Sequence, residues 1–344
     1  MEPGTRTTEY SCAPTQAWNQ QTRGLTAGWL TQGLDEASMG KASRTKVDSS
    51  RREKIAAQRA AARRAEQRRR ILIASGSVLA VLAIVVAFVV IKLNSSPSSD
   101  NSPNGPTGAA LASVASTVTS VPASVLDTVG DGSGSVTATP TSIKGAALTA
   151  NGKPEVLYIG AEYCPYCAAE RWAMIVALSR FGTFSGLATV HSAAANGAGQ
   201  AEPYPNTPTW TFVHATYTSK YLTFTPVEEQ TNIPDPSTGT YTTLDTPTTA
   251  QQALLTKYDS SSGGAIPFVD FGNKYLIAGA SYNAGVLSKL SWATIAADLS
   301  NPNSAVAKAV DGTANYITAA ICQLTGNQPA SACTATVKSL ESKI

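Results

Sequence analysis

Two cysteines separated by two residues are the part of the sequence best suited to chemistry. Cys164 and Cys167 enclose Pro165 and Tyr166, and cysteines at this spacing can close a small disulfide. If a helix begins here, the first sulfur faces unpaired backbone N–H groups and the positive end of the helix dipole, and both favour the thiolate. Because the thiolate is the nucleophile in disulfide exchange, we predict that an exposed Cys164 attacks and that Cys167 resolves the mixed disulfide. Tyr166 is expected at the surface, where it can contact a substrate.

The same spacing also occurs in zinc sites and in structural disulfides. Zinc needs a second pair of ligands. Cys322 and Cys333 are eleven residues apart, which makes them poor candidates. His191 and His214 fall in expected strands and are equally poor candidates. We therefore predict no metal site and no cofactor, while a passive disulfide stays open as an alternative.

The residues around the pair predict a strand before it and a helix after it. Residues 156–160 are a compact apolar run, typical of a buried strand. From Ala168 to Phe181, apolar side chains recur mostly at three and four residue steps, which is typical of a helix. Pro165 suits the first helical turn, because it has no N–H to lose there. Roughly a hundred residues later, Ile266 and Pro267 precede another apolar run that indicates a strand.

Patterning elsewhere predicts further elements. Thr246 is expected to cap a helix over 246–258, with Pro247 at its first position. Gly272 and Asn273 are expected to form a two-residue turn between two strands. Residues 111–129 should form one or two short helices, with Pro122 at a start or a break. The other expected strands cover 187–191, 209–214 and 221–225, and the other expected helices cover 291–299 and 304–324.

The order of strand, CxxC, helix and a later Ile-Pro before a strand resembles the thioredoxin superfamily. In that superfamily the cysteines stand at a helix N-terminus, and a cis-proline opposite them begins a later strand. The resemblance implies that Pro267 is this cis-proline and that Ile266 offers backbone groups to a bound substrate chain. Residues 158–172 and 177–182 are similar, more closely, to a membrane-anchored thioredoxin-like family of unknown function from high-GC Gram-positive bacteria and archaea.

The fold class that the resemblance implies is α/β. From about Leu111 to the C-terminus, we expect a thioredoxin-like fold with extra C-terminal helices. The stretch between Cys167 and Pro267 is longer than a minimal fold of this kind needs, so an insertion is expected at about 194–246.

Two charged residues follow the cysteines within the expected helix. Glu170 and Arg171 are predicted to be a solvent-facing pair. The alternative is that the carboxylate lies beneath the cysteines and moves protons. Trp172 is predicted to lie in the core.

A membrane anchor is expected near the N-terminus. Residues 71–91 contain no charge and have the length of one transmembrane helix, and the long segment before them argues against a cleaved signal peptide. Residues 51–70 carry nine Lys or Arg against two Glu, which places the N-terminus in the cytoplasm. We interpret this segment as a juxtamembrane helix on anionic membrane lipid rather than as a nucleic-acid-binding helix. Residues 1–50 are expected to be a disordered cytosolic tail, and 92–108 a flexible linker to an extracytoplasmic domain at 109–344.

Composition agrees with this division. With 43% hydrophobic and 14% charged residues, a wholly disordered chain is excluded. Residues 1–91 carry a net charge of +7 and residues 92–344 a net charge of −4. Four of the five cysteines lie on the side expected to be oxidising, and Cys12 lies on the other. If Cys164 pairs with Cys167, then Cys322 pairs with Cys333; this bridge is expected to be structural, with a relay to the CxxC pair as the alternative.

Together these features predict a single-pass membrane protein whose outer domain exchanges thiols and disulfides with exported proteins and with an unidentified redox partner. The alternative is a non-enzymatic binding or envelope-assembly module whose disulfides are structural. The spacing does not set the direction of transfer, because reduction potentials of CxxC proteins span about −270 to −120 mV.

Overall fold

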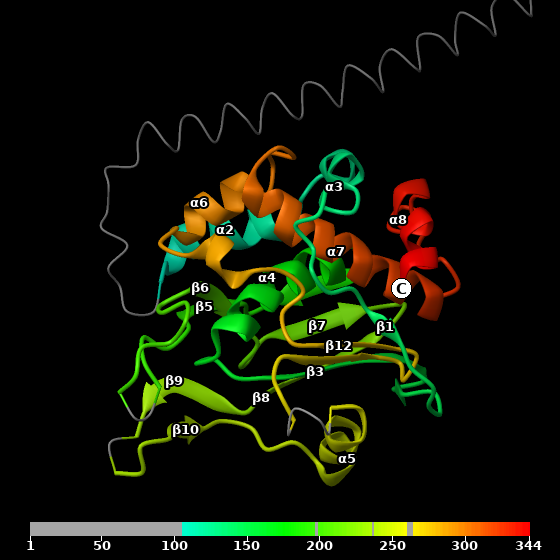
Figure 1. The fold of residues 1–344 in the computed structure, drawn as a ribbon. Coiled ribbons are helices and arrows are strands. Elements are labelled where there is room, and N and C mark those ends of the chain that lie inside the picture. Colours follow the sequence, from blue (N-terminus) through cyan, green and yellow to red (C-terminus); the bar gives the residue numbers. More distant parts are fainter. Residues whose placement is uncertain (1–104, 197–198, 236, 260–263) are drawn as a thin grey trace, which may run out of the picture. The chain divides into compact units, whose positions relative to one another are not determined.

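The computed structural model describes residues 105–344, with gaps at 197–198, 236 and 260–263 (Figure 1). These residues fall in one unit of the chain, Pro97–Ile344. The predicted cytosolic tail, juxtamembrane helix and 71–91 span, most of the predicted linker, and Cys12 lie outside the described residues. They therefore stay predictions.

A mixed β-sheet is built around strand β3 (Lys153–Gly160), which is buried from Val156 onward. On one side β8 (Thr223–Glu228) runs parallel to it, and on the other β11 (Phe268–Phe271) runs antiparallel. β12 (Tyr275–Ala278) and β1 (Thr141–Ser142) extend the sheet beyond β11, while β2 (Thr149–Ala150) pairs with the start of β3. Because β3 is covered on both faces, its sequence is a continuous apolar run rather than an alternating one.

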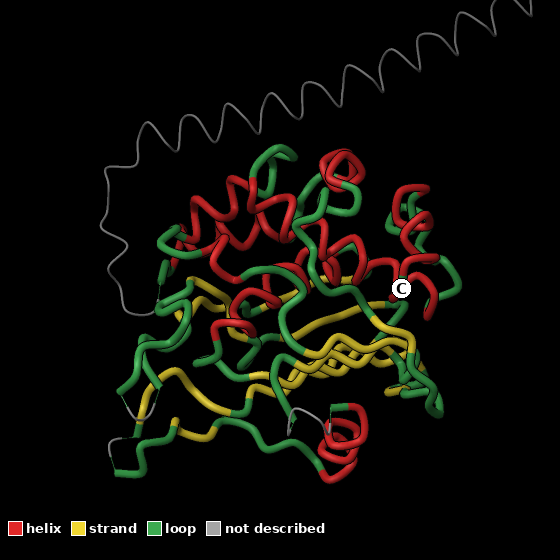
Figure 2. Tube along the Cα trace, viewed as in Figure 1, coloured by secondary structure: helices red, strands yellow, loops and turns green. Residues whose placement is uncertain are grey.

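Helices cover both faces of this sheet, as Figures 1 and 2 show. On one face α4 (Pro165–Ser179) packs against α7 (Ala305–Leu324) around a large core, and on the other α5 (Thr249–Tyr258) covers a smaller core. Side chains of β3 alternate between these cores, with Tyr158 in the larger and Leu157 in the smaller. The remaining helices are α2 (Gly108–Val118), α3 (Ala123–Val129), α6 (Trp292–Asp298) and α8 (Ala335–Leu340), with the 3₁₀ helices η2 (Ala284–Leu287) and η3 (Glu341–Lys343).

Three small antiparallel ribbons lie between α4 and α5 in the sequence. They pair β4 (Gly182–Ser185) with β7 (Thr216–Ser219), β5 (Ala188–His191) with β6 (Pro208–Thr211), and β9 (Gln230–Pro234) with β10 (Tyr241–Thr243). The insertion predicted at 194–246 is therefore not one added segment, because it also contains β8, the parallel neighbour of β3. The length argument could not separate added chain from a strand of the central sheet.

Local elements follow the sequence with small shifts. Helix α5 starts two residues later than predicted, since Thr248 rather than Thr246 caps it in a capping box with Gln251. A third residue joins Gly272 and Asn273 in the turn between β11 and β12, because Phe271 pairs with Tyr275. Pro122 separates α2 from α3, as predicted.

Helices in the described part of the chain were compared with the dimensions of a membrane span. None of them is by itself long and apolar enough to cross a bilayer. Only α2 and α3 taken together meet the length and hydropathy criteria, and these two helices are bent by 59° relative to each other.

A disulfide joins Cys322, near the end of α7, to Cys333, just before α8. The two Cα atoms are 5.8 Å apart and both side chains are buried. The predicted pairing is confirmed, and it fixes the C-terminal helix to the helix that packs on α4.

Removing this bridge should lower stability without touching the cysteines at α4. A cross-link across eleven residues restricts the unfolded chain, so Cys322→Ala with Cys333→Ala should lower the free energy of unfolding by about 3 kcal/mol. Urea denaturation of the full-length protein, monitored by tryptophan fluorescence, checks this. Equal midpoints in the variant and the wild type would contradict it.

Candidate functional site

Cys164 stands where helix α4 begins. It is the N-cap residue, with extended backbone angles, and Pro165 follows in the first turn. The backbone N–H of Cys167 donates a hydrogen bond to Sγ of Cys164 at 3.2 Å. The sulfur therefore takes the place of the side-chain oxygen that usually satisfies the free N–H groups at a helix start. The expected order of strand, cysteine pair and helix is present.

Both cysteines are free thiols in this structure, and both are buried. Cys164 is only 5% exposed and Cys167 is not exposed at all, so the expectation of an exposed attacking sulfur was wrong. Tyr166 is 40% exposed, as predicted.

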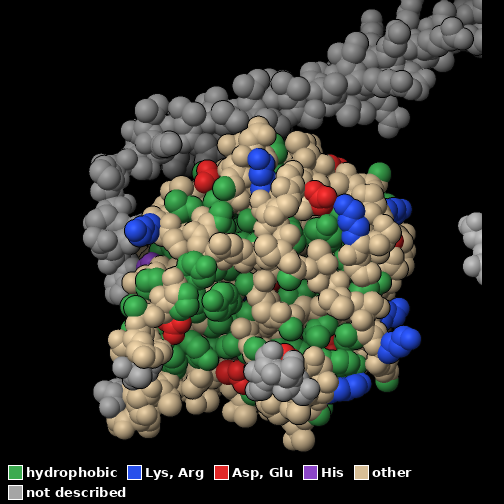
Figure 3. Space-filling view, viewed as in Figure 1, with side chains coloured by type: hydrophobic (Ala, Val, Ile, Leu, Met, Phe, Trp, Pro, Cys, Tyr) green, Lys and Arg blue, Asp and Glu red, His purple; other side chains and the backbone are tan. Residues whose placement is uncertain are grey.

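Aromatic residues of the small ribbons and loops pack against the tyrosines around the pair. Tyr241 of β10 stacks on Tyr163 with ring centroids 4.2 Å apart. The Tyr204 ring contacts Tyr166 edge-on, with centroids 6.1 Å apart. Figure 3 shows hydrophobic side chains gathered on the face between α6 and β9. The segment between α4 and α5 thus contacts Tyr163 and Tyr166, on either side of Cys164 in the sequence. Patterning in the sequence had indicated no role for this segment.

The loop before β11 approaches the first cysteine. The Ile266–Pro267 peptide bond is cis, as the resemblance implies, and Pro267 directly precedes the strand. The Cys164 thiol donates a hydrogen bond to the carbonyl oxygen of Ile266, with 3.8 Å between Sγ and the oxygen. The structure thus brings together Cys164, Cys167 and the Ile266–Pro267 loop, although a hundred residues separate the two parts of the site.

The surroundings of the two sulfurs shift their pKa values in opposite directions. The pKa of Cys164 is lowered, first by a hydrogen bond from the Cys167 thiol and then by backbone N–H groups and the charge of Arg171, although burial opposes this. Burial raises the pKa of Cys167 well above its ordinary value, and its hydrogen bond to Cys164 adds to the rise. The pair therefore favours one thiolate at the helix start with a protonated thiol beside it.

Arg171 lies one helical turn beyond Cys167 and is completely buried. Its Nε and Nη2 donate to the two carboxylate oxygens of Glu228 at 2.8 and 2.6 Å, a bidentate pair in the interior. Glu228 ends β8, so the ion pair joins α4 to the sheet. The pKa of the Glu228 carboxyl is nonetheless raised, because burial outweighs the charge of Arg171.

Glu170 is also completely buried, so the prediction of a solvent-facing Glu170–Arg171 pair was wrong. Its two carboxylate oxygens accept hydrogen bonds from the backbone N–H and the hydroxyl of Ser281, at 2.9 and 3.1 Å. The prediction failed because every residue of α4 from Cys167 to Leu178 is buried. Trp172 lies in the core as predicted, and its Nε1 donates to the carbonyl of Pro208 at 2.9 Å.

Pattern reasoning did not find Glu228 or Ser281, the buried partners of the charged residues of α4. Both come from segments distant in sequence and have no local signature. The one signal available was the four-residue step from Cys167 to Arg171, which places both on one helix face.

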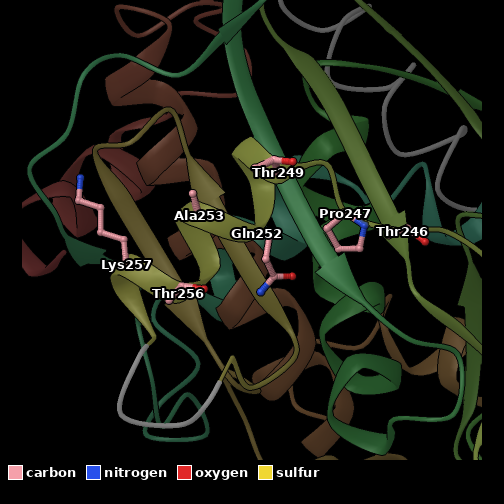
Figure 4. Close-up of a pocket in the computed structure, with 7 residues that line it drawn as sticks. All are labelled: Thr246, Pro247, Thr249, Gln252, Ala253, Thr256 and Lys257. Carbon is pink, nitrogen blue, oxygen red and sulfur yellow. The ribbon is translucent and has the colours of Figure 1, made fainter.

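No metal centre is apparent in the part of the chain that the structure describes, since no group of three or more His, Cys, Asp and Glu residues is arranged to hold an ion. A surface hollow lies along α5, and Figure 4 shows its lining. The hollow is lined by Thr246, Pro247, Thr249, Gln252, Ala253, Thr256 and Lys257. None of these residues belongs to the cysteine site.

A family model described as a domain of unknown function (DUF929) matches residues 139–323, which is just over half of the chain. The chain belongs to this family. The matched DUF929 region contains both cysteines of the helix start, Arg171, Glu228 and the Ile266–Pro267 loop, whereas Cys333 lies beyond it. Comparisons with curated proteins and with solved structures found no match.

Alkylation should separate the two sulfurs by their pKa values. In the full-length protein carrying Cys12→Ser, the reaction of iodoacetamide with Cys164 should have its pH midpoint below 9, and that of Cys167 above 9. Peptide mass spectrometry assigns the rate to each thiol in the protein that keeps both cysteines, because each thiol contributes to the pKa shift of the other. Midpoints that coincide would contradict this assignment.

Glu170 should make stability depend on pH. Burial raises its pKa from 4.5 to about 7, so the folded state holds the proton more tightly than the unfolded state. Its stabilising contribution is complete below pH 4.5 and is lost as the pH rises through 7. Between pH 4.5 and pH 8, the free energy of unfolding of Glu170→Gln should therefore rise by about 3 kcal/mol relative to that of the wild type. Denaturation midpoints at several pH values test this, and parallel curves would disprove it.

Proposed function

We propose that this DUF929 protein is a membrane-anchored thiol–disulfide oxidoreductase that acts on exported proteins. One observation carries the proposal: Cys164 caps helix α4 with its thiolate favoured, next to a protonated Cys167 and 3.8 Å from the Ile266 carbonyl. A nucleophilic sulfur, a resolving sulfur and a backbone group for a substrate chain are the three parts that disulfide exchange needs.

A thioredoxin-like fold is part of this proposal. Its support is the succession of β3, the cysteine pair and α4, with Pro267 directly before β11 and the carbonyl oxygen of Ile266 3.8 Å from Sγ of Cys164. Strand β11 is the antiparallel neighbour of β3, which explains how the proline loop reaches the helix start. The ribbons and the helices α6 to α8 would be additions to that fold.

The proposed exchange uses each sulfur once. The Cys164 thiolate attacks a substrate disulfide, a bond forms between Cys164 and one substrate sulfur, and the other substrate sulfur leaves as a thiolate. Cys167, after losing its proton, then attacks Cys164 and releases the second substrate thiolate, so that the substrate is reduced and the pair is oxidised. The reverse sequence oxidises a substrate dithiol.

Membrane attachment belongs to the proposal through the sequence. The uncharged run at 71–91 and the nine cations before it support a cytoplasmic N-terminus and an outer domain. The Cys322–Cys333 disulfide supports the same placement, because disulfides persist in oxidising compartments. The proposed partners are exported proteins, membrane lipid and a second redox protein.

The burial of Cys164 favours a second candidate function. With 5% of its surface exposed, the sulfur offers little area to a folded partner, as expected for a binding or envelope-assembly module. In that case both cysteine pairs would serve the structure.

Trapping distinguishes the two candidates. In the full-length protein with Cys12→Ser and Cys167→Ala, Cys164 should accumulate mixed disulfides with exported proteins, because no sulfur remains to resolve them. Non-reducing gels detect them as reductant-sensitive bands, and adding Cys164→Ala is the matched control that should abolish them. Insulin reduction by the Cys164→Ser variant should fall to the uncatalysed rate.

Equal insulin rates in wild type and Cys164→Ser, together with no trapped species, would favour the binding module. The pair Cys322→Ala with Cys333→Ala tests the relay alternative. It should leave trapping through Cys164 intact if the second bridge is structural, and reduce it if the bridge passes oxidising equivalents.

A further inference from the structure

Two buried hydrogen-bond donors next to the cysteine pair have no partner in the described part of the chain. They are Nη1 of Arg171 and the hydroxyl of Tyr158. Cζ of Arg171 lies 5.7 Å from the centre of the Tyr158 ring. The Tyr158 hydroxyl lies over Gly160, where any Cβ would collide with it. Buried donors without partners destabilise a fold, and natural proteins concentrate such groups where function requires them.

The titratable groups around Cys164 lie on α4, β8, β3 and the turn before α4. Arg171 on α4 supplies the positive charge, and its interaction lowers the pKa of both cysteines. Glu228 at the end of β8 supplies a negative charge, held on the guanidinium by two hydrogen bonds. Tyr158 on β3 and Tyr163 before α4 have pKa values raised by burial, so they are neutral at physiological pH.

Geometry makes Arg171 more than a packing residue. It shares the α4 face with Cys167, it is fixed by a bidentate contact, and one of its donors is unused. Leucine or methionine would fill the same interior without the cost of burying an ion pair. Arg171 and both cysteines are buried, and a fixed charge acts strongly in such a medium of low dielectric.

We propose that Arg171 is a positioning residue whose guanidinium, held in place by Glu228, stabilises the Cys164 thiolate and thereby makes the cysteine pair an oxidant of dithiols in exported proteins. This inference rests on the proposed function, and it assigns the direction of transfer that the CxxC spacing leaves open. Stabilising the thiolate favours the reduced form of the pair over its disulfide, which raises the reduction potential.

The oxidation balances as follows. Two substrate thiols form one disulfide and give up two electrons and two protons. The Cys164–Cys167 disulfide takes both electrons and breaks, leaving the Cys164 thiolate and the Cys167 thiol. Cys167 keeps one proton and solvent receives the other. A partner protein's disulfide of higher potential then reoxidises the pair.

Two variants should change the thiolate fraction of Cys164 in opposite directions. Arg171→Met with Glu228→Gln removes the ion pair, so the thiolate fraction of Cys164 at a pH below its midpoint should fall about tenfold. The equilibrium constant for reduction by glutathione should fall about tenfold, which is about 30 mV. Glu228→Gln alone leaves the cation without its counterion and should raise both quantities. Thiolate absorbance and equilibration in glutathione buffers measure them in the full-length protein carrying Cys12→Ser.

A half-buried cation at the opposite end of the same helix provides the control. Arg180, which closes α4, donates to Asn315 and to the carbonyl of Ala332, away from the cysteines. Arg180→Met should leave the potential as in wild type while it lowers stability. A purely structural role for Arg171 would move stability in all three variants and the potential in none.

The results separate this inference from the function on which it rests. Opposite shifts in the two Arg171–Glu228 variants support the inference, and unchanged potentials in variants that keep a folded circular dichroism spectrum overturn it. If the double variant does not fold, Glu228→Gln alone decides the test, because the inference predicts that this variant raises the reduction potential. If wild type forms no disulfide with any glutathione ratio, the proposed function fails, whereas exchange in wild type with unshifted variants rejects the role of Arg171 alone.

Discussion

Helix α4 is buried along almost its whole length, and this constraint determines most of what surrounds it. Only Tyr166 and Ser179 of its residues escape burial, so polar groups on the helix cannot rely on water and need partners inside the protein. Glu170 accepts hydrogen bonds from Ser281, and Arg171 donates hydrogen bonds to Glu228. Each partner comes from a different segment, so the helix is tied to β8 and to the chain after β12 by its own polar side chains.

The same constraint leads to the chemistry. A buried helix has four unpaired N–H groups at its start, and in this chain a cysteine stands there instead of serine or aspartate. Sulfur satisfies part of that need, and in return the backbone N–H groups favour its ionised form. The β9–β10 ribbon and the loop before β11 cover the helix start, through Tyr241 on Tyr163 and Ile266 beside Cys164.

The strand before the cysteines, helix α4 and the C-terminal helices follow from local patterns, because apolar periodicity depends on neighbouring residues. The pairing of Cys322 with Cys333 followed from counting, and the proline loop was found through a family resemblance rather than through the residues alone. Solvent exposure could not be predicted in this way. Glu170 and Arg171 have the charge of surface residues, and only the tertiary neighbours Ser281 and Glu228 make their burial possible. A strand was expected at 221–225, where β8 lies, but its place beside β3 could not be predicted, since that pairing joins segments about sixty residues apart in the chain.

Burial acts on the cysteine pair in two opposing ways. It limits the area that Cys164 offers to a partner, and by itself it disfavours the thiolate. It also lowers the local dielectric, so that the guanidinium of Arg171 and the N–H groups at the helix start act on the sulfur more strongly than they would in water. A surface cysteine would be accessible, but it would gain little from those groups. A buried pair without a cation would have only hydrogen bonds to offset the effect of burial on the Cys164 thiolate. The combination of a nearly closed site with a fixed positive charge therefore fits a sulfur whose ionisation is controlled by the fold, and it makes substrate access, rather than thiol reactivity, the step on which the proposed exchange depends.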